Sequence, residues 1–146
     1  MDRYIVNVEV VVCKGSQYLI TRRSFAEEVA PGMLSFPGGK VERTNSGNDV
    51  LERTAARELW EETGITAVNY RYVTSKLFTT PSGKTVIDII FAAEYLCGEA
   101  VVGAPDELDS VFWITGEGLL SLPDLPPWTR EAYKLAIARG SVCSCP

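Results

Sequence analysis

The sequence predicts an α/β fold, with strands before and after one central helix and a second helix near the end of the chain. Three observations support this prediction. Segments rich in Val and Ile lie on both sides of residues 49–63, and residues 49–63 repeat apolar side chains at helical spacing. Residues 128–139 form a second candidate helix, which Gly140 follows. Elements in this order pack as layers of helix against sheet.

The first third of the chain predicts a hairpin and a loop. Residues 5–13 are rich in Val and Ile and predict a strand, and residues 14–16, Lys-Gly-Ser, predict a turn. Gln17–Arg23 is the expected partner strand. Residues 24–34 contain Pro31-Gly32 and predict an irregular loop that leads towards Gly38 and Gly39.

The central helix has an apolar stripe and candidate ends. Leu51, Ala55 and Leu59 recur every fourth residue, so we expect them to face the core. Asp49 starts an Asp-Val-Leu-Glu segment that resembles a helix cap, and its side chain is expected to accept hydrogen bonds from free N–H groups. Gly64 is expected just past the last helical turn.

The second half predicts two strands, a short third strand and the closing helix. Residues 67–79 and 85–96 predict strands around a Pro-Ser-Gly-Lys turn, and residues 111–114 predict a short strand. Residues 119–127 are expected to be a loop. With no internal repeat or linker, residues 1–146 are expected to form a single domain, in which residues 141–146 are a frayed tail.

Composition excludes several classes of protein. The net charge of −5 argues against a nucleic-acid duplex as partner, because phosphate backbones are bound by Lys and Arg. A small anionic substrate stays compatible, because a bound divalent cation would dominate the local field. The absence of histidine excludes Ser-His and Cys-His nucleophile systems and His-based zinc sites.

No apolar run approaches the ~20 residues of a membrane helix, and the N-terminus does not resemble a signal peptide, so we expect a cytoplasmic protein without membrane contact. Cys13 and Cys97 lie in apolar strand-like segments and are expected to be buried thiols. For Cys143 and Cys145 we favour a frayed terminus over a small redox or metal-binding tail.

Three glutamates crowd one face of the central helix. Glu58 and Glu62 are four residues apart and Glu61 is three from Glu58, so all three share one arc of the helix. Like charges at this spacing repel, and the last turn of a helix favours cations rather than acids. A solvated acidic face is the simpler alternative. The neighbouring Gly-Gly, Arg-Glu and Gly-Ile pairs favour a site for a hard cation such as Mg²⁺ or Mn²⁺.

Residues 36–65 resemble the Nudix box, G-x5-E-x7-R-E-U-x-E-E-x-G-U, in which U is aliphatic. The segment from Arg57 to Ile65, Arg-Glu-Leu-Trp-Glu-Glu-Thr-Gly-Ile, matches the second half of the pattern without exception, and Phe-Pro-Gly-Gly-Lys-Val-Glu is typical of the lead-in. The resemblance implies a mixed β-sheet between α-helices. It also implies metal-dependent cleavage of a pyrophosphate linkage in a nucleoside di- or triphosphate derivative, with a small nucleotide as substrate.

The first half of the box departs from the pattern. Counting back from Arg57 places the first acid of the box at Asp49, ten residues after Gly39 where the family has six. We interpret residues 43–48 as a loop with four additional residues, dispensable for chemistry. In the family this first acid braces the arginine, so Asp49 is expected to hold Arg57.

The resemblance assigns roles to further residues. Glu58 and Glu62 are the expected core metal ligands, Glu61 is a further ligand, and the backbone carbonyl of Gly38 completes the set. The general base is Glu58 or a glutamate outside the box. The candidates outside the box are Glu99, Asp106, Glu107 and Asp109. Glu107 is favoured because it precedes Trp113 by six residues, as in MutT-type members, so the expected catalytic carboxylates are those of Glu58, Glu61, Glu62 and Glu107.

The substrate itself stays open. Arg23 resembles a substrate-contacting arginine of MutT-type strands, with a surface ion pair as the alternative. Phe36 is a candidate for stacking on a base, with a core position as the alternative. MutT-like segments favour a nucleoside triphosphate, whereas Pro81 falls near a proline of ADP-ribose pyrophosphatases. Thr129 stands near where the guanine-reading asparagine would fall. A catalytically silent nucleotide sensor and a homodimer are kept as alternatives.

Overall fold

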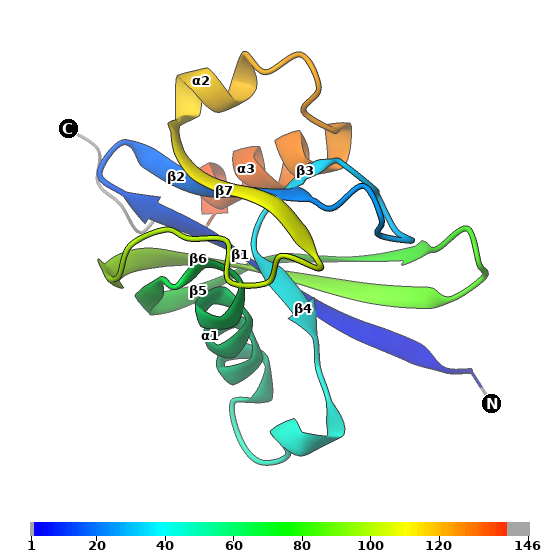
Figure 1. Cartoon of the computed structure of the whole chain (residues 1–146). Coiled ribbons are helices and arrows are strands. Elements are labelled where there is room, and N and C mark those ends of the chain that lie inside the picture. Colours follow the sequence, from blue (N-terminus) through cyan, green and yellow to red (C-terminus); the bar gives the residue numbers. More distant parts are fainter. Residues whose placement is uncertain (1, 140–146) are drawn as a thin grey trace.

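The computed structural model describes residues 2–139, whose strands form one mixed seven-stranded sheet with helices on both faces (Figure 1). α1 lies against one face, and α2 and α3 lie on the other. This arrangement confirms the predicted α/β fold with a mixed sheet between helices. The predicted tail at residues 141–146, with Cys143 and Cys145, lies outside the described residues.

The sheet is mixed because its central strands β1 and β6 run parallel while the other pairs are antiparallel. Its order is β3-β2-β1-β6-β5, with β4 paired to β1 and β7 paired to β2. The strands are β1 (Tyr4–Lys14), β2 (Gln17–Arg23), β3 (Leu34–Ser35), β4 (Gly38–Lys40), β5 (Thr66–Thr79), β6 (Thr85–Cys97) and β7 (Leu108–Thr115). The helices are the 3₁₀ helix η1 (Arg43–Asn45), α1 (Val50–Thr63), α2 (Gly116–Leu120) and α3 (Pro127–Arg139).

Two hydrophobic clusters fill the space on either side of the sheet. Alternation along β1 sends Val8 and Val10 to the cluster under α1, and Val11 to the cluster under α3. On α1, Ala55 and Leu59 are fully buried, and Leu51 packs against the same cluster. The predicted apolar stripe of the central helix is therefore confirmed.

The short elements between the long ones differ from the prediction. No strand was predicted at β3, which begins at the last residue of the predicted loop, or at β4, which contains Gly38 and Gly39 themselves, and no helix was predicted at α2, residues 116–120. α2 forms because the Thr115 side chain accepts the backbone N–H of Gly118 at 3.0 Å, which caps the helix. α3 begins at Pro127, one residue earlier than predicted, and proline is favoured in a first helical turn.

The entry into α1 also differs from the prediction. Asp49 precedes the helix with a left-handed backbone (φ 54°), and its side chain makes no capping hydrogen bond, so the predicted cap is wrong. Instead Arg53 donates hydrogen bonds to the backbone carbonyls of Asn45, Ser46 and Asn48 at 2.8–3.1 Å. The segment before the helix is therefore tied to it by a side chain from within the helix.

The cysteines depart in part from the expectation of buried thiols. Cys13 is buried, but its sulfur is in a disulfide bond. Cys97 is a free cysteine and is exposed, because it is the last residue of β6 and lies beyond the covered part of the strand. Within residues 2–139, no helix has the length and apolar character needed to cross a membrane.

Candidate active site

The site is built around two glycines of β4 that lie between β1 and α1. Gly38 pairs with Glu9 and Gly39 pairs with Val8 across the antiparallel β1–β4 ladder. A Cβ atom on Gly38 would come within 2.1 Å of the Val8 carbonyl oxygen, and one on Gly39 within 2.3 Å of Cδ of Glu58. Only glycine at both positions allows β1, β4 and the Glu58 side chain to approach this closely.

Two of the three predicted helix carboxylates are buried against these glycines. Glu58 and Glu62 are 9% and 6% exposed, whereas the Glu61 side chain is half exposed. Oε1 of Glu62 accepts the backbone N–H of Gly38 at 3.0 Å. The structure therefore brings Gly38, Gly39, Glu58 and Glu62 together, with Glu61 at the rim.

Burial makes both carboxylates hard to ionise. It raises the pKa of Glu62 from 4.5 to about 8, against the hydrogen bond from Gly38, with smaller contributions from the charges of Glu58 and Glu107. Burial likewise raises the pKa of Glu58 to about 7, against the attraction of Arg57. Perturbed acids of this kind concentrate at functional sites, because a cation or substrate is needed to stabilise their charge.

Arg57 is the cation nearest to the helix glutamates in sequence, and it binds two of them. Its Nη1 lies 3.0 Å from Oε1 of Glu58 and 3.4 Å from Oε2 of Glu61. Its Nη2 donates to the carbonyl of Lys40 and to Oδ1 of Asn45, both at 3.4 Å. The expected partner, Asp49, is exposed, and the acceptor from the preceding segment is Asn45 instead.

Asn45 was missed because the box was counted back from Arg57. Counting forward from Gly39 by the family spacing of six residues leads to Asn45. The prediction that residues 43–48 form a loop is corrected for residues 43–45, which form η1, and Asn45 is buried and contacts Arg57.

The loop after β6 holds the C-terminal end of α1. Gly64 ends the helix in the left-handed conformation (φ 73°), as predicted, and its N–H bonds to the carbonyl of Trp60. The N–H groups of Val101 and Gly103 donate to the carbonyls of Thr63 and Glu62 at 3.0 and 2.9 Å. These bonds satisfy carbonyls that have no partner within the helix.

The same loop delivers Glu107 to the site. Glu107 follows Gly103 by four residues, its carbonyl accepts the N–H of Ser24 at 2.8 Å, and the next residue begins β7 opposite Arg23. Its charge contributes to the raised pKa values of both Glu58 and Glu62. Glu99, Asp106 and Asp109 are not among the charges with this effect.

The two arginines at the end of β2 both make ion pairs. Nη1 of Arg22 lies 2.9 Å from Asp124 and donates to the carbonyl of Gly32. Nε of Arg23 donates to the carbonyl of Val29 at 2.8 Å, and its Nη2 lies 3.6 Å from Glu27. The positive charge of Arg23 also lowers the pKa of Glu62, so this side chain lies towards the acidic site.

Phe36 and Thr129 belong to the protein interior. Phe36 is 3% exposed and packs in the cluster under α3, which corresponds to the core alternative for this residue. Thr129 is buried, and its hydroxyl donates to the carbonyl of Leu34 at 2.9 Å. Neither side chain presents a surface to a base in this structure.

A second acidic pair lies beside Gly38. Glu9 on β1 is hydrogen-bonded to the buried Asp88 on β6, and burial together with this neighbour raises the pKa of Glu9 well above its usual value. Asn7 donates to Oδ1 of Asp88 at 2.8 Å. The sequence carries a visible indication of this pair, because each acid interrupts an otherwise apolar strand.

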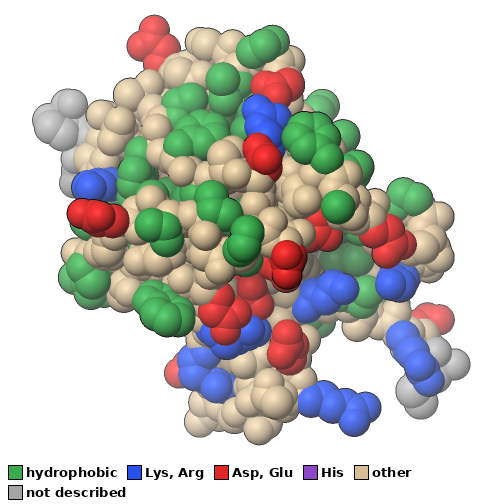
Figure 2. Space-filling model, in the orientation of Figure 1, with side chains coloured by type: hydrophobic (Ala, Val, Ile, Leu, Met, Phe, Trp, Pro, Cys, Tyr) green, Lys and Arg blue, Asp and Glu red, His purple; other side chains and the backbone are tan. Residues whose placement is uncertain are grey.

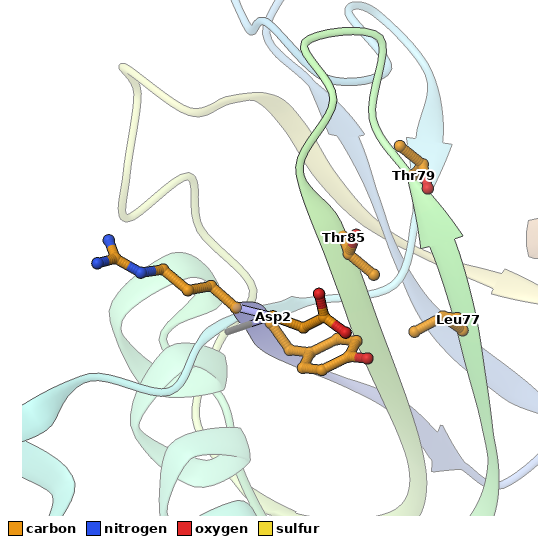
Figure 3. Close-up of a pocket in the computed structure, with 6 residues that line it drawn as sticks. Asp2, Leu77, Thr79 and Thr85 are labelled. Carbon is orange, nitrogen blue, oxygen red and sulfur yellow. The ribbon is translucent and has the colours of Figure 1, made fainter.

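The surface over the site is strongly charged. Figure 2 shows acidic side chains gathered where α1, β4 and the loop before β7 meet, with basic side chains next to them. A separate open hollow of about 530 Å³ lies between the N-terminal end of β1 and the β5–β6 hairpin (Figure 3). It is lined by Asp2, Arg3, Tyr4, Leu77, Thr79 and Thr85 and contains none of the predicted site residues.

Comparison with known families decides what this arrangement is. Residues 3–136 match the NUDIX domain. The chain belongs to the Nudix family. The match covers every site residue described above, from the β1 strand to α3.

Curated Nudix relatives include NAD-capped RNA hydrolases named NudC. The protein from Pseudomonas aeruginosa strain LESB58 is 30% identical over 132 residues, which is 90% of this chain and 44% of the relative. The protein from Escherichia coli O1:K1 is 41% identical over 95 residues, which is 65% of this chain and 34% of the relative. The chain therefore spans less than half the length of these relatives.

Solved structures of Nudix proteins share the fold. A MutT protein from Methanosarcina mazei has a TM-score of 0.77 at 28% identity, covering 96% of this chain and 97% of that one. A MutT Nudix hydrolase from Burkholderia pseudomallei has a TM-score of 0.75 at 25% identity, covering 92% and 98%. The Nudix domain of Shewanella oneidensis NrtR, solved with ADP ribose, has a TM-score of 0.78 at 17% identity, covering 97% and 91%.

Nudix proteins typically use divalent metals. The side chains of this site have the type of donor atom that such an ion prefers. The desolvated carboxylates of Glu58 and Glu62 are hard oxygen donors, and the backbone of Gly38 and Gly39 lies against them because no Cβ atom intervenes. Among the described residues, no three acidic or sulfur ligands converge tightly enough to form a complete metal cluster. Glu61 points its carboxylate to Arg57 and would have to turn to join the set.

Proposed function

We propose that the chain is a metal-dependent pyrophosphohydrolase that cleaves a phosphoric anhydride in a nucleoside di- or triphosphate derivative. The observation that carries the proposal is the pair of buried, hard-to-ionise glutamates, Glu58 and Glu62, facing Gly38 and Gly39 with Glu107 close by. A buried acid pair of this kind destabilises the free protein and becomes favourable once a cation neutralises it.

In this proposal Glu58 and Glu62 hold Mg²⁺ or Mn²⁺, with the carbonyl of Gly38 and a reoriented Glu61 completing the set. The cation would supply charge neutralisation for the phosphate oxygens and a lower pKa for bound water. Water forms a bond to one phosphorus as the anhydride P–O bond breaks, and its proton passes to a glutamate. Glu58 or Glu107 is the candidate for that base, because the family pattern points to these two positions and the charge of Glu107 acts on the pKa of Glu58.

Arg23 is the proposed phosphate contact. It lies towards the acidic site, its partner Glu27 is 3.6 Å away, and exchange of that carboxylate for a phosphate would keep its charge paired. Similarity to NAD-capped RNA hydrolases and to MutT proteins makes dinucleotides and nucleoside triphosphates the first classes to test.

A nucleotide sensor is the second candidate. The observation that favours it is the shared fold with the NrtR Nudix domain solved with ADP ribose. Retention of Glu58, Glu61 and Glu62 in this chain supports catalysis over binding alone.

The test is a panel of NAD⁺, ADP-ribose, nucleoside triphosphates and NAD-capped RNA with Mg²⁺ or Mn²⁺, with products separated by chromatography. Glu62→Gln should lower turnover at least ~100-fold. Glu52→Gln, on the same helix outside the acidic cluster, is the matched control and should stay near wild type. Full activity in excess EDTA or in Glu62→Gln would refute metal-dependent hydrolysis by these carboxylates. Tight nucleotide binding without any product would establish the sensor.

A further inference from the structure

Phe25 is the aromatic side chain with the largest exposed fraction among residues 2–139, at 73%. It lies in the loop between β2 and β3, residues 24–33, and the reaction proposed above gives it no role. A single exposed apolar side chain is common on protein surfaces and by itself indicates nothing. Phe25 differs from such a side chain in what supports its ring, in the hydrogen bonds of its loop, and in the charged groups next to it.

The Phe25 ring lies on a glycine that leaves room for it. A Cβ atom on Gly32 would come within 2.4 Å of Cε1 and 2.6 Å of Cδ1 of the ring. Gly32 also has a left-handed backbone (φ 69°), which favours glycine. The ring therefore covers Gly32, which is buried, while most of the surface of Phe25 stays open to solvent.

Hydrogen bonds hold the loop that carries this ring. The carbonyl of Ser24 accepts the N–H of Gly32 at 3.2 Å, which closes the loop. From β2, Nη1 of Arg22 donates to the carbonyl of Gly32 at 2.9 Å. Nε of Arg23 donates to the carbonyl of Val29 at 2.8 Å. A loop held in this way keeps the ring in place before a ligand arrives, which lowers the entropic cost of binding.

The loop begins next to the charged groups of the candidate active site. Arg23, the proposed phosphate contact, is two residues before Phe25, so their Cα atoms are at most ~7 Å apart. Ser24, which lies between them, donates its N–H to the carbonyl of Glu107 at 2.8 Å. In a nucleoside di- or triphosphate derivative, the aromatic base is joined to the phosphates through one ribose. A substrate whose phosphate meets Arg23 therefore has its base within reach of this part of the loop.

We propose that Phe25 is a base-stacking residue, which binds the nucleobase of the substrate on its exposed ring while Arg23 binds a phosphate. The inference rests on the proposed function and deepens it, because it names the group that receives the base. Phe36, the candidate from the sequence, is buried in the core and does not provide this contact. Stacking on one ring tolerates any base, because every base has a π-face, so selection among bases belongs to other groups.

The test uses a pair of ligands that differ only in the nucleoside. α,β-Methylene-ADP has a methylene group in place of its anhydride oxygen, so it has no anhydride to hydrolyse, and methylenediphosphonate lacks the adenosine. Isothermal titration calorimetry in Mg²⁺ measures the Kd of each ligand. Phe25→Ala should raise the Kd of α,β-methylene-ADP about tenfold, as expected for lost base stacking, and leave that of methylenediphosphonate within about twofold. Tyr72→Ala removes another exposed aromatic side chain, on β5, and as the matched control it should bind both ligands like wild type.

Two more variants separate stacking from a structural role. Phe25→Leu still covers Gly32 but has no π-face, so it should lose affinity for α,β-methylene-ADP alone. Phe25→Trp keeps an aromatic ring, and its added fluorescence should change with α,β-methylene-ADP and not with methylenediphosphonate. An equal loss of affinity for both ligands in Phe25→Ala would overturn the inference, as would a wild-type Kd for α,β-methylene-ADP in this variant.

Failure of the base contact and failure of the proposed function give different results. If Phe25→Ala loses only α,β-methylene-ADP while the wild-type chain hydrolyses no nucleotide of the panel, the base contact is supported and the enzyme is refuted. If the wild-type chain hydrolyses nucleotides and Phe25→Ala binds α,β-methylene-ADP normally, the base contact is overturned and the enzyme stands. A wild-type chain that does not bind α,β-methylene-ADP would also overturn the base contact.

Discussion

Replacing Glu62 by glutamine should stabilise the metal-free protein at neutral pH while it lowers turnover at least ~100-fold. Glu62 is 6% exposed, and burial is the main reason that its pKa rises to about 8. Glutamine keeps an oxygen that can accept the N–H of Gly38, and it carries no charge. The variant therefore escapes the ionisation that burial makes unfavourable.

The sign and size of the effect follow from proton linkage. Between pH 4.5 and 8 the folded protein keeps the Glu62 proton that the unfolded chain has released, so the free energy of unfolding falls as pH rises. One proton is equivalent to ~1.4 kcal/mol per pH unit, so two units set a ceiling of ~3 kcal/mol. Glu58 is present in both wild type and Glu62→Gln, so its contribution to the pH dependence largely cancels in the difference between their stabilities. We expect wild type to lose roughly 1–3 kcal/mol relative to Glu62→Gln between about pH 5.5 and about pH 7.5.

Urea denaturation in EDTA at the two pH values measures this difference. The unsatisfied amide of the new glutamine adds a contribution that does not depend on pH, so the change between the two pH values is the decisive quantity. Glu52→Gln is the matched control and should follow wild type. The reasoning fails if the stability difference between wild type and Glu62→Gln is the same at both pH values.

Three further predictions concern the same site. Millimolar Mg²⁺ should raise the melting temperature of wild type at about pH 7.5, because it binds only the native state; a melting temperature that does not respond to Mg²⁺ or Mn²⁺, with or without nucleotide, would count against the site. Glu107→Ala should depress kcat more than it raises KM, whereas Asp109→Ala should stay within a few-fold of wild type; steady-state kinetics with the reverse ranking would move the assignment to Asp109. Arg23→Ala should raise KM about tenfold with a smaller effect on kcat, and Glu27→Gln should not raise KM, because it only frees Arg23; an unchanged KM in Arg23→Ala would exclude the phosphate contact.

Long elements could be predicted from the sequence because many consecutive residues follow the same strand-like or helical pattern. The strands β2, β5 and β6 and the helix α1 match their predicted ranges within one residue at each end. Their β-branched runs and apolar stripes report directly on burial. The box glutamates could be placed for the same reason, because helical spacing fixes which side chains share a face.

Short elements could not be predicted, because their stability comes from partners far away in the chain. β4 is Gly-Gly-Lys and has no intrinsic preference for a strand; it forms because two residues without side chains can lie against β1 and Glu58. Phe36 shows a related limit, since an apolar ring before the glycines is compatible with a core or a ligand contact until the fold is known.

The partner of Arg57 shows a third limit. Spacing along the chain placed an acid at Asp49, whereas the fold presents the amide of Asn45 from a 3₁₀ turn. Two counting directions gave two answers, and only the path of the chain between Gly39 and α1 selects one. The pairing of Glu9 with Asp88 escaped notice similarly, because it depends on the parallel register of β1 and β6.

The backbone hydrogen bonds between the end of α1 and the loop at Val101 and Gly103 fix the position of this loop relative to the candidate active site. These bonds involve no side chain, and they fix the backbone at Gly103, which is four residues before Glu107. Exposed residues such as Val101 and Val102 are therefore free to vary without moving the acid. The length of this segment is not free, since one residue more or less would shift Glu107 relative to Glu58 and Glu62. The identity of the exposed side chains in this segment can thus change, while its length is expected to stay constant if Glu107 acts in the proposed reaction.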